Sequence, residues 1–204
     1  MLETDYLVIG AGAMGMAFTD VLLDETDASV MIVDRANRPG GHWNDAYPFV
    51  RLHQPSAFYG VNSRPLGSDR IDTDGWNAGL YELASGPEVV AYFDQVMHQR
   101  FIPSGRVQYF PMHEFDPSGV ADERTDAGRV VTCTSLVSGE TIEVLVRRKL
   151  VDATYMNVTV PSQRPPKYSI ADGVRHGPVN ALGTLREPAD RYVVVGAGKT
   201  GADA

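Results

Sequence analysis

The beginning of the chain alternates between runs of consecutive hydrophobic residues and a stretch in which such residues recur at helical spacing. The runs at residues 7–9 and 30–33 are continuously apolar, which is typical of parallel strands covered on both faces. The stretch between them predicts an amphipathic helix over residues 14–24. Its expected buried face consists of Met14, Phe18, Val21 and Leu22. Residues 5–34 are therefore predicted to form a strand–helix–strand unit.

A second helix and a third parallel strand are predicted further along. Ser85 and Glu88 are spaced as a capping box at the start of a helix over residues 85–101. The hydrophobic residues on one side of that helix are Val89, Tyr92, Phe93, Val96 and Met97. Residues 107–110 follow as the strand. The segment 37–85 is irregular and rich in Gly, Pro, Asn and aromatic residues, and its length favours a binding role over a passive connection.

The second half of the chain is predicted to contain strands and connections. Two strand-like runs around a Ser-Gly turn predict a hairpin over residues 129–146, and residues 149–154 predict a further strand. Residues 155–190 carry five prolines and no clear period, so we expect a connection there. Residues 192–195 again read as a short apolar strand.

Composition and charge narrow the class of protein. The 204 residues are 43% hydrophobic and 22% charged, with a net charge of −8, which argues against a nucleic-acid partner or an anionic membrane surface. No apolar run approaches the roughly 20 residues that span a bilayer, and the run at residues 7–9 is too short for a signal peptide. We therefore expect a cytoplasmic protein. The single cysteine, Cys133, leaves no redox pair and is expected in the core, and the histidines lack metal-ligand spacing.

The clearest motif is G-x-G-x-x-G at Gly10, Gly12 and Gly15, directly after a predicted strand and directly before a predicted helix. In dinucleotide-binding folds the first glycine permits a tight turn, the second lets the backbone approach a pyrophosphate, and the third lets helix and strand pack closely. Asp34 ends the second strand, where a carboxylate accepts a hydrogen bond from a ribose hydroxyl and disfavours a 2′-phosphate. The site should therefore take FAD or NAD. The alternative is a glycine-rich turn followed by a surface aspartate.

A second copy of the motif stands at Gly196, Gly198 and Gly201, after the predicted strand at residues 192–195. The sequence stops three residues later, before a helix of full length could form. We therefore expect residues 191–204 to be the truncated start of a second unit.

Paired glycines follow the acidic residue, in the run Gly40-Gly41-His42-Trp43. Together with the two glycine motifs, this acid-x5-G-G-x-W pattern resembles the flavin-containing monooxygenase superfamily, which includes Baeyer–Villiger enzymes and N-hydroxylases. The resemblance extends along the whole chain but covers only about the first half of a typical member. The Baeyer–Villiger fingerprint F-x-G-x-x-x-H is not matched: the nearest run, residues 171–176, lacks the phenylalanine and spaces His176 one residue short. That subclass is therefore not assigned.

The resemblance implies an α/β fold with three parts. Residues 1–160 would form a Rossmann-like FAD-binding domain with a parallel sheet and a small β-meander at residues 129–146. Residues 161–190 would be a connection, and residues 191–204 would begin an NAD(P)-binding domain.

The resemblance also implies a set of cofactor-binding residues. The pyrophosphate of FAD would lie at Gly10, Gly12, Ala13, Met14 and Gly15, and the adenosine ribose at Asp34, next to which Arg35 is a further cofactor-binding candidate. The flavin and its ribityl chain would lie near Gly41, His42, Trp43 and Gln54. Ala153 belongs to a strand that resembles the family's Ala-Thr-Gly motif, with Tyr155 in place of the glycine. Gly196, Gly198 and Gly201 would bind NAD(P)H, with NADP as the family expectation. Trp43 could equally be a core aromatic, and His42 or His53 a packed or surface histidine.

The implied activity is that of an NAD(P)H-dependent flavoprotein monooxygenase that inserts one oxygen atom from O2 into a small organic substrate. No catalytic residue can be assigned. One alternative is an FAD/NAD(P) reductase or dehydrogenase without oxygen chemistry, among which the disulfide-reducing kind is disfavoured because Cys133 has no partner. Another is a non-catalytic FAD-binding module, which would leave the strand at residues 192–195 unpaired. We expect the 204-residue chain alone to bind FAD weakly and to be inactive.

Overall fold

The computed structural model describes residues 1–119, 127–154 and 164–204. Its centre is a six-stranded sheet in the order β5-β2-β1-β8-β7-β6. The strands are β1 (Leu2–Ile9), β2 (Val30–Asp34), β5 (Val107–Pro111), β6 (His113–Asp116), β7 (Arg129–Ser135) and β8 (Thr141–Asp152). Strands β5, β2, β1 and β8 are parallel, whereas β7 and β6 continue the sheet in antiparallel pairing. The third parallel strand and the hairpin predicted from the sequence are both confirmed.

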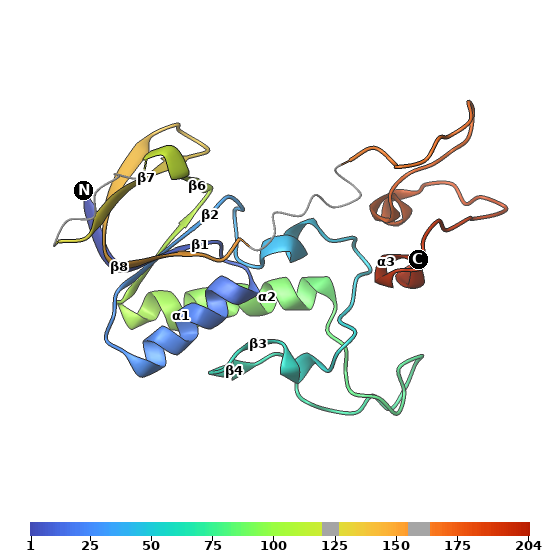
Figure 1. Ribbon diagram of the computed structural model, residues 1–204. Helices are drawn as coiled ribbons and strands as arrows, with labels where there is room; N and C mark the ends of the chain where they lie inside the picture. The colour runs from blue at the N-terminus through green and yellow to red at the C-terminus, as the bar shows by residue number, and fades with distance from the viewer. Residues whose placement is uncertain (120–126, 155–163) are drawn as a thin grey trace.

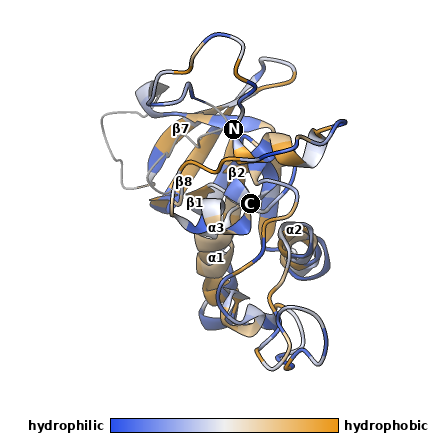
Figure 2. Cartoon of the chain, turned by 90° about the vertical axis from the view of Figure 1, so that its right-hand side faces the viewer, coloured by the Kyte–Doolittle hydropathy of each residue, from blue (hydrophilic) through white to orange (hydrophobic). Residues whose placement is uncertain are grey.

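Two helices cover one face of the parallel strands, and the antiparallel strands curl over the other face (Figure 1). The helices are α1 (Ala13–Glu25) and α2 (Gly86–Val96), and α2 continues through a wider turn at Met97–Phe101. Two hydrophobic clusters result. One lies between the sheet and the helices, and the other lies on the opposite face, where residues of β1 and β2 pack against residues of β7 and β8. Figure 2 shows hydrophobic stretches on the strands of the sheet.

The capping box and the apolar face predicted for α2 are confirmed. The Ser85 side chain accepts from the Glu88 amide, and the Glu88 carboxylate accepts from the Ser85 amide at 2.7 Å. The predicted inward residues of α2 are all buried, with Phe93 and Val96 fully so.

The buried face predicted for α1 is correct for Leu22, which is buried, and for Phe18, which packs against the core, but the other two predicted residues face outward. Met14 and Val21 are 65% and 42% exposed, whereas Met16 and Leu23 are buried. The cause is Gly15: its Cα packs so closely on the preceding turn that an added Cβ would lie 2.0 Å from the Gly10 carbonyl oxygen. Close backbone packing at a glycine therefore sets the inward face of α1, and hydrophobicity alone does not reveal it.

Residues 141–146 and 149–154 were expected to be two strands, but residues 141–152 form the single strand β8. Its pairing with β1 shifts register between Thr4, which pairs with Val146, and Tyr6, which pairs with Lys149. Arg147 and Arg148 lie at this bulge, and both approach the carboxylate of Asp5, at 3.3 and 3.4 Å from Oδ1. The bulge therefore lets one strand pass from the hairpin into the parallel sheet without a break.

The strand predicted at residues 192–195 does not form. In the described part of the chain no strand pairs with this segment, and Val193 is 78% exposed. A strand needs a neighbour to satisfy its backbone groups, so an apolar run alone does not produce one. The connection before it contains a short 3-10 turn at Val179–Thr184, and the helical turn α3 (Lys199–Asp203) follows it.

A short hairpin of β3 (Gly60–Val61) and β4 (Arg64–Pro65) is tied to α1 by a buried carboxylate. Asp20 is fully buried and accepts hydrogen bonds from the Ser63 amide at 2.9 Å and the Ser63 hydroxyl at 2.6 Å. Arg100, at the end of the α2 extension, donates to Asp20 at 2.7 Å and also reaches Asp24. A buried carboxylate is stable only with such partners, so Asp20 holds three separate segments together.

Candidate cofactor-binding site

The first glycine motif forms a tight turn between β1 and α1. Gly10 has a φ of 102°, in the left-handed region that favours glycine. Gly15 lies directly over the Gly10 carbonyl, where no side chain fits. The first and third glycines therefore shape the turn, as the motif predicts.

The beginning of α1 is open to an anion. Gly12 occupies the N-cap position without a capping side chain, and no acidic residue lies in the first helical turn. The N–H groups of a first helical turn have no intrahelical acceptor and carry a partial positive charge. The backbone at Gly12, Ala13 and Met14 therefore offers donors suited to a phosphate group.

The paired glycines close over this turn. The Gly40 amide donates to the Ala11 carbonyl at 2.9 Å. A Cβ placed on Gly41 would lie 2.9 Å from the Cα of Gly12, closer than real Cβ contacts, and Gly41 itself has a φ of 56°. The first glycine motif and the paired glycines were recognised separately in the sequence, and the structure brings them into direct contact.

Asp34 lies at the carboxyl end of β2, beside the same turn. Its Oδ2 accepts from the Ala11 amide at 2.5 Å and its Oδ1 accepts from the Ala36 amide at 2.7 Å. A carboxylate oxygen has a further lone pair, so both oxygens keep capacity for a ribose hydroxyl. Arg35, in contrast, is exposed and extends toward Glu114, 4.0 Å away. The structure therefore brings Asp34 to the turn and directs Arg35 away from it.

Ala153 follows β8 and lies against the first glycine. Its amide donates to the Ile9 carbonyl at 2.9 Å, and its carbonyl oxygen is 3.2 Å from where a Cβ on Gly10 would stand. Tyr155, the departure from the family motif, lies outside the described residues.

His42 and Trp43 continue from Gly41 to the edge of a cleft. Trp43 is half-buried and packs against the helix-side core, while its indole Nε1 donates to the Tyr59 hydroxyl at 2.7 Å. The His42 ring lies over Trp43 with centroids 5.3 Å apart, and the surrounding protein atoms lower the pKa of His42 by desolvation. Trp43 therefore fits both interpretations of the sequence, because it packs in the core and also lines the cleft.

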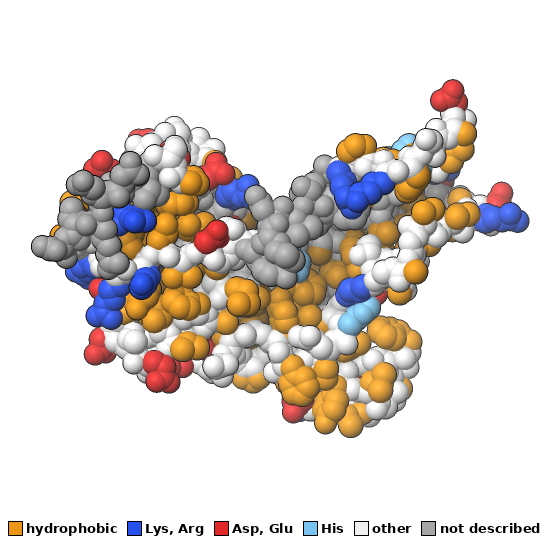
Figure 3. Space-filling view, viewed as in Figure 1, with side chains coloured by type: hydrophobic (Ala, Val, Ile, Leu, Met, Phe, Trp, Pro, Cys, Tyr) orange, Lys and Arg blue, Asp and Glu red, His pale blue; other side chains and the backbone are white. Residues whose placement is uncertain are grey.

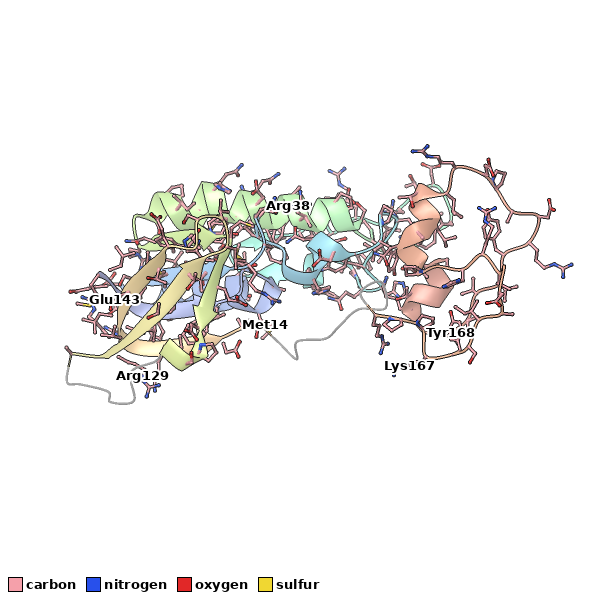
Figure 4. All side chains as sticks on the ribbon, turned by 90° about the horizontal axis from the view of Figure 1, so that it is seen from above. Met14, Arg38, Arg129, Glu143, Lys167 and Tyr168 are labelled. Atoms are coloured by element: carbon pink, nitrogen blue, oxygen red, sulfur yellow. The ribbon has the colours of Figure 1, made fainter. Side chains whose placement is uncertain are left out.

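The cleft has a volume of about 1690 Å³. On one side it is lined by His42, Trp43, Gln54 and Tyr59, and on the other by residues of the C-terminal segment, including Gly196, Gly198 and Gly201. Figure 3 shows a hollow between the body of the domain and this segment. Lys167 and Tyr168, labelled in Figure 4, belong to the same segment and also line the cleft.

The second glycine motif repeats the local geometry of the first. Gly196 has a φ of 133°, and a Cβ on Gly201 would lie 2.6 Å from the Gly196 carbonyl oxygen. Gly198 caps α3 with φ −81° and ψ 176°, close to the φ −82° and ψ −175° of Gly12. The turn therefore forms at the second motif although the preceding strand does not.

A polar cluster joins α3 to the loop after the paired glycines. Asp203 accepts from the Tyr47 hydroxyl at 2.5 Å and from Lys199 at 2.6 Å, and His53 Nε2 lies 3.0 Å from its other oxygen. Partial burial acts to raise the pKa of Asp203, but the hydrogen bonds from Lys199, Tyr47 and His53 lower it to about 2. Sequence reasoning missed this cluster because its members lie some 150 positions apart and match no motif.

Other kinds of site are not indicated within the described residues. Cys133 is buried, and desolvation raises the pKa of its thiol to about 11. No group of His, Cys, Asp and Glu in residues 1–119, 127–154 and 164–204 could hold a metal ion. Among the same residues no helix is both long and apolar enough to cross a membrane.

Comparison with known proteins agrees with this geometry. Residues 8–61, which include the first glycine motif, Asp34 and the paired glycines, match the family described as an NAD(P)-binding Rossmann-like domain. Curated relatives from Mycobacterium tuberculosis and Mycobacterium bovis, both uncharacterized proteins, are 57% identical over 202 residues. The match covers 99% of this chain and 35% of each relative, so the chain spans about a third of their length.

Solved structures share the fold. A flavin-containing monooxygenase from Stenotrophomonas maltophilia is similar with a TM-score of 0.51 and 21% identity, over 76% of this chain and 39% of that one. A bacillithiol disulfide reductase from Staphylococcus aureus has a TM-score of 0.54 and 12% identity over the same shares. A cyclohexanone monooxygenase variant from Rhodococcus sp. Phi1, bound to NADP+, has a TM-score of 0.51 and 21% identity, over 81% and 29%. The α/β Rossmann-like fold implied by the resemblance to flavin-containing monooxygenases is therefore confirmed, and the chain covers 39% and 29% of the two monooxygenase structures.

Proposed function

We propose that this chain is the FAD-binding part of an NAD(P)H-dependent flavoprotein monooxygenase that acts on a small organic substrate. One observation supports this most strongly: two glycine turns of matching local geometry occur in one chain, the second at a cleft and the first behind the opposite wall of that cleft. The second turn lines the cleft directly, and the first turn touches Gly41, whose neighbours His42 and Trp43 form the facing wall. An enzyme that transfers a hydride between two dinucleotides needs such a pair of sites side by side.

FAD fits the first turn better than NADP does. The uncapped start of α1 suits a pyrophosphate, and Asp34 would repel a 2′-phosphate while it accepts from a ribose hydroxyl. The two glycines Gly12 and Gly41 pack against each other at the start of α1, where a larger residue at position 41 would not fit. In this proposal the amides at Gly12, Ala13 and Met14 hold the pyrophosphate, and Ala153 borders the turn. The chemistry that FAD supplies when bound is acceptance of a hydride and, in a monooxygenase, activation of O2.

The second site is proposed for NAD(P)H, with NADPH as the expected nucleotide. Gly196, Gly198 and Gly201 adopt the turn that such a ligand requires. We further propose residues 1–160 as the FAD domain, residues 161–190 as its connection and residues 191–204 as the start of the NAD(P) domain, in a cytoplasmic protein.

The competing function is a reductase or dehydrogenase without oxygen chemistry, because the bacillithiol disulfide reductase shares the fold. A disulfide-reducing mechanism would need a reactive thiol. The buried Cys133, whose pKa is raised to about 11, does not supply one in this part of the chain.

The test is a titration of the purified chain with FAD, followed by flavin fluorescence and the visible spectrum. We expect weak, saturable binding and no steady oxidation of NADPH by these residues alone. A longer protein that contains them should consume NADPH and O2 together when its substrate is present. NADPH oxidation with an added electron acceptor but without O2 uptake would favour the reductase, and binding of NAD instead of FAD would overturn the flavoprotein assignment.

A further inference from the structure

The hydroxyl of Tyr59, at the wall of the cleft, accepts one hydrogen bond within the protein, but its own proton is not donated to a described residue. It receives the indole Nε1–H of Trp43 at 2.7 Å. An indole nitrogen can only donate, so the phenol oxygen is the acceptor in this contact and its own proton is not involved. Within residues 1–119, 127–154 and 164–204, the Tyr59 hydroxyl donates to no protein acceptor.

Tyr92, a neighbouring tyrosine in the core, shows what a purely structural phenol does here. Its hydroxyl accepts from the Val61 amide at 2.8 Å and donates to the Arg64 carbonyl at 2.6 Å. The hydroxyl of Tyr92 therefore both accepts and donates a hydrogen bond inside the protein. Tyr59 differs because it lines the cleft with a donor that remains available.

The Tyr59 ring is also held in place. It packs edge-on against Trp43, with centroids 5.8 Å apart, and against the fully buried Phe93, at 6.1 Å. Its amide donates to the Ser56 carbonyl at 3.0 Å. Burial raises the pKa of the phenol, so it keeps its proton at neutral pH. A donor fixed in this way needs little reorganisation to bind a ligand.

Direct contacts connect this donor to the proposed flavin site. The first glycine turn touches Gly41 at Gly12, and the chain then runs through His42 to Trp43, which holds Tyr59. A series of contacts and chain neighbours therefore links the proposed pyrophosphate position to the phenol.

We propose that Tyr59 binds the isoalloxazine ring of FAD by donating a hydrogen bond to one of its acceptor atoms, and that Trp43 is the residue that positions this donor. The inference rests on the proposed function, since it assigns a further residue to the same site. It names a ligand contact that the sequence motifs did not indicate.

The experiment compares FAD binding to the purified chain and to its Tyr59→Phe variant, which keeps the ring and loses the hydroxyl. We expect about three- to tenfold weaker FAD binding, the effect of one hydrogen bond, and a shift of the visible flavin bands. Tyr92→Phe is the matched control: it removes a phenol that does not face the cleft, so it should lower thermal stability and leave the flavin spectrum unchanged.

The Trp43→Phe variant separates the hydrogen-bond donor, the Tyr59 hydroxyl, from the indole that positions it. This variant keeps the Tyr59 proton but frees its orientation, so FAD binding should weaken less than in Tyr59→Phe. Adding Tyr59→Phe to Trp43→Phe should weaken binding again, because the donor itself is then lost. If the double variant binds FAD as Trp43→Phe does, the effect belongs to Trp43 and the inference is wrong.

The outcomes distinguish the inference from the function on which it rests. An unaltered chain that binds no FAD overturns both. An unaltered chain that binds FAD, with Tyr59→Phe matching its affinity and spectrum, overturns the role of Tyr59 and leaves the flavoprotein assignment intact.

Discussion

Two glycines of the same motif should respond to substitution in opposite ways. Gly12 has φ −82° and ψ −175°, which any residue can adopt, and an added Cβ would lie 3.4 Å from the Gly41 Cα, an ordinary contact. At Gly15 the added Cβ would lie 2.0 Å from the Gly10 carbonyl oxygen. Gly12→Ala should therefore affect ligand binding, whereas Gly15→Ala should affect the fold.

The magnitudes follow from these contacts. Alanine at Gly12 loses a favoured N-cap residue but restricts the unfolded chain, and the two effects nearly cancel, to within about 0.5 kcal/mol of the free energy of unfolding. Alanine at Gly15 gains about 1 kcal/mol of helix propensity but must relieve an overpacked backbone contact that costs about 3 kcal/mol. The net loss of about 2 kcal/mol corresponds to a melting temperature lower by about 4–8 °C for a chain of this size.

The effect on FAD affinity, unlike the effect on stability, should be specific to Gly12→Ala. A methyl group at Gly12 keeps the pyrophosphate from the amides at the start of α1, and the loss of one hydrogen bond to a charged group weakens binding about 10- to 100-fold. Thermal unfolding and FAD titration of both variants test this directly. If Gly12→Ala melts several degrees lower, or binds FAD as the unaltered chain does, then the roles given to these glycines are wrong.

Three further results are expected. Asp20→Ala should lower the free energy of unfolding in urea by about 3 kcal/mol because it leaves buried donors unpaired, whereas the half-exposed Asp24→Ala should cost less than about 0.5 kcal/mol; equal losses would contradict the buried contact. Cys133, with a pKa near 11, should react with a thiol reagent at pH 8 only as fast as the chain unfolds, and rapid reaction of the native chain would show that it is accessible. The depressed pKa of Asp203 means that its contacts stabilise α3 above the ordinary value of 3.8 and are lost as the pH falls through about 2. Tyr47→Phe should raise that pKa in a carboxyl NMR titration, and an unchanged value would remove Tyr47 from the cluster.

The parts of the fold that the sequence predicted are those set by local pattern. Strands β1, β2 and β5, the capping box at Ser85 and the turn at Gly10 depend on residues close together in the chain, so their signals are complete in short windows. The same holds for the second turn at Gly196, which forms without a neighbouring strand.

The parts that could not be predicted depend on tertiary contacts. The inward face of α1 follows from the packing of Gly15, which has no hydrophobic signal, and residues 192–195 have no partner strand among the residues that the structure describes. At the candidate site, the motifs identified Gly12, Asp34 and Gly41, but not Tyr59, whose role depends on a single hydrogen bond from Trp43.

Asp34 has a structural role in the glycine turn in addition to its proposed contact with the ribose. Its carboxylate holds the Ala11 and Ala36 amides, so Asp34→Ala would disturb the glycine turn as well as remove a ribose contact. A loss of binding in that variant would therefore not separate the two roles, and Gly12→Ala is the sharper probe.

The central claim is that the first glycine turn binds FAD, and a competition titration on the unaltered chain tests it most directly. FAD fluorescence is followed as the chain is added, and NAD is then added in excess. We expect saturable FAD binding that NAD displaces poorly. Binding of NAD with no measurable binding of FAD would contradict it.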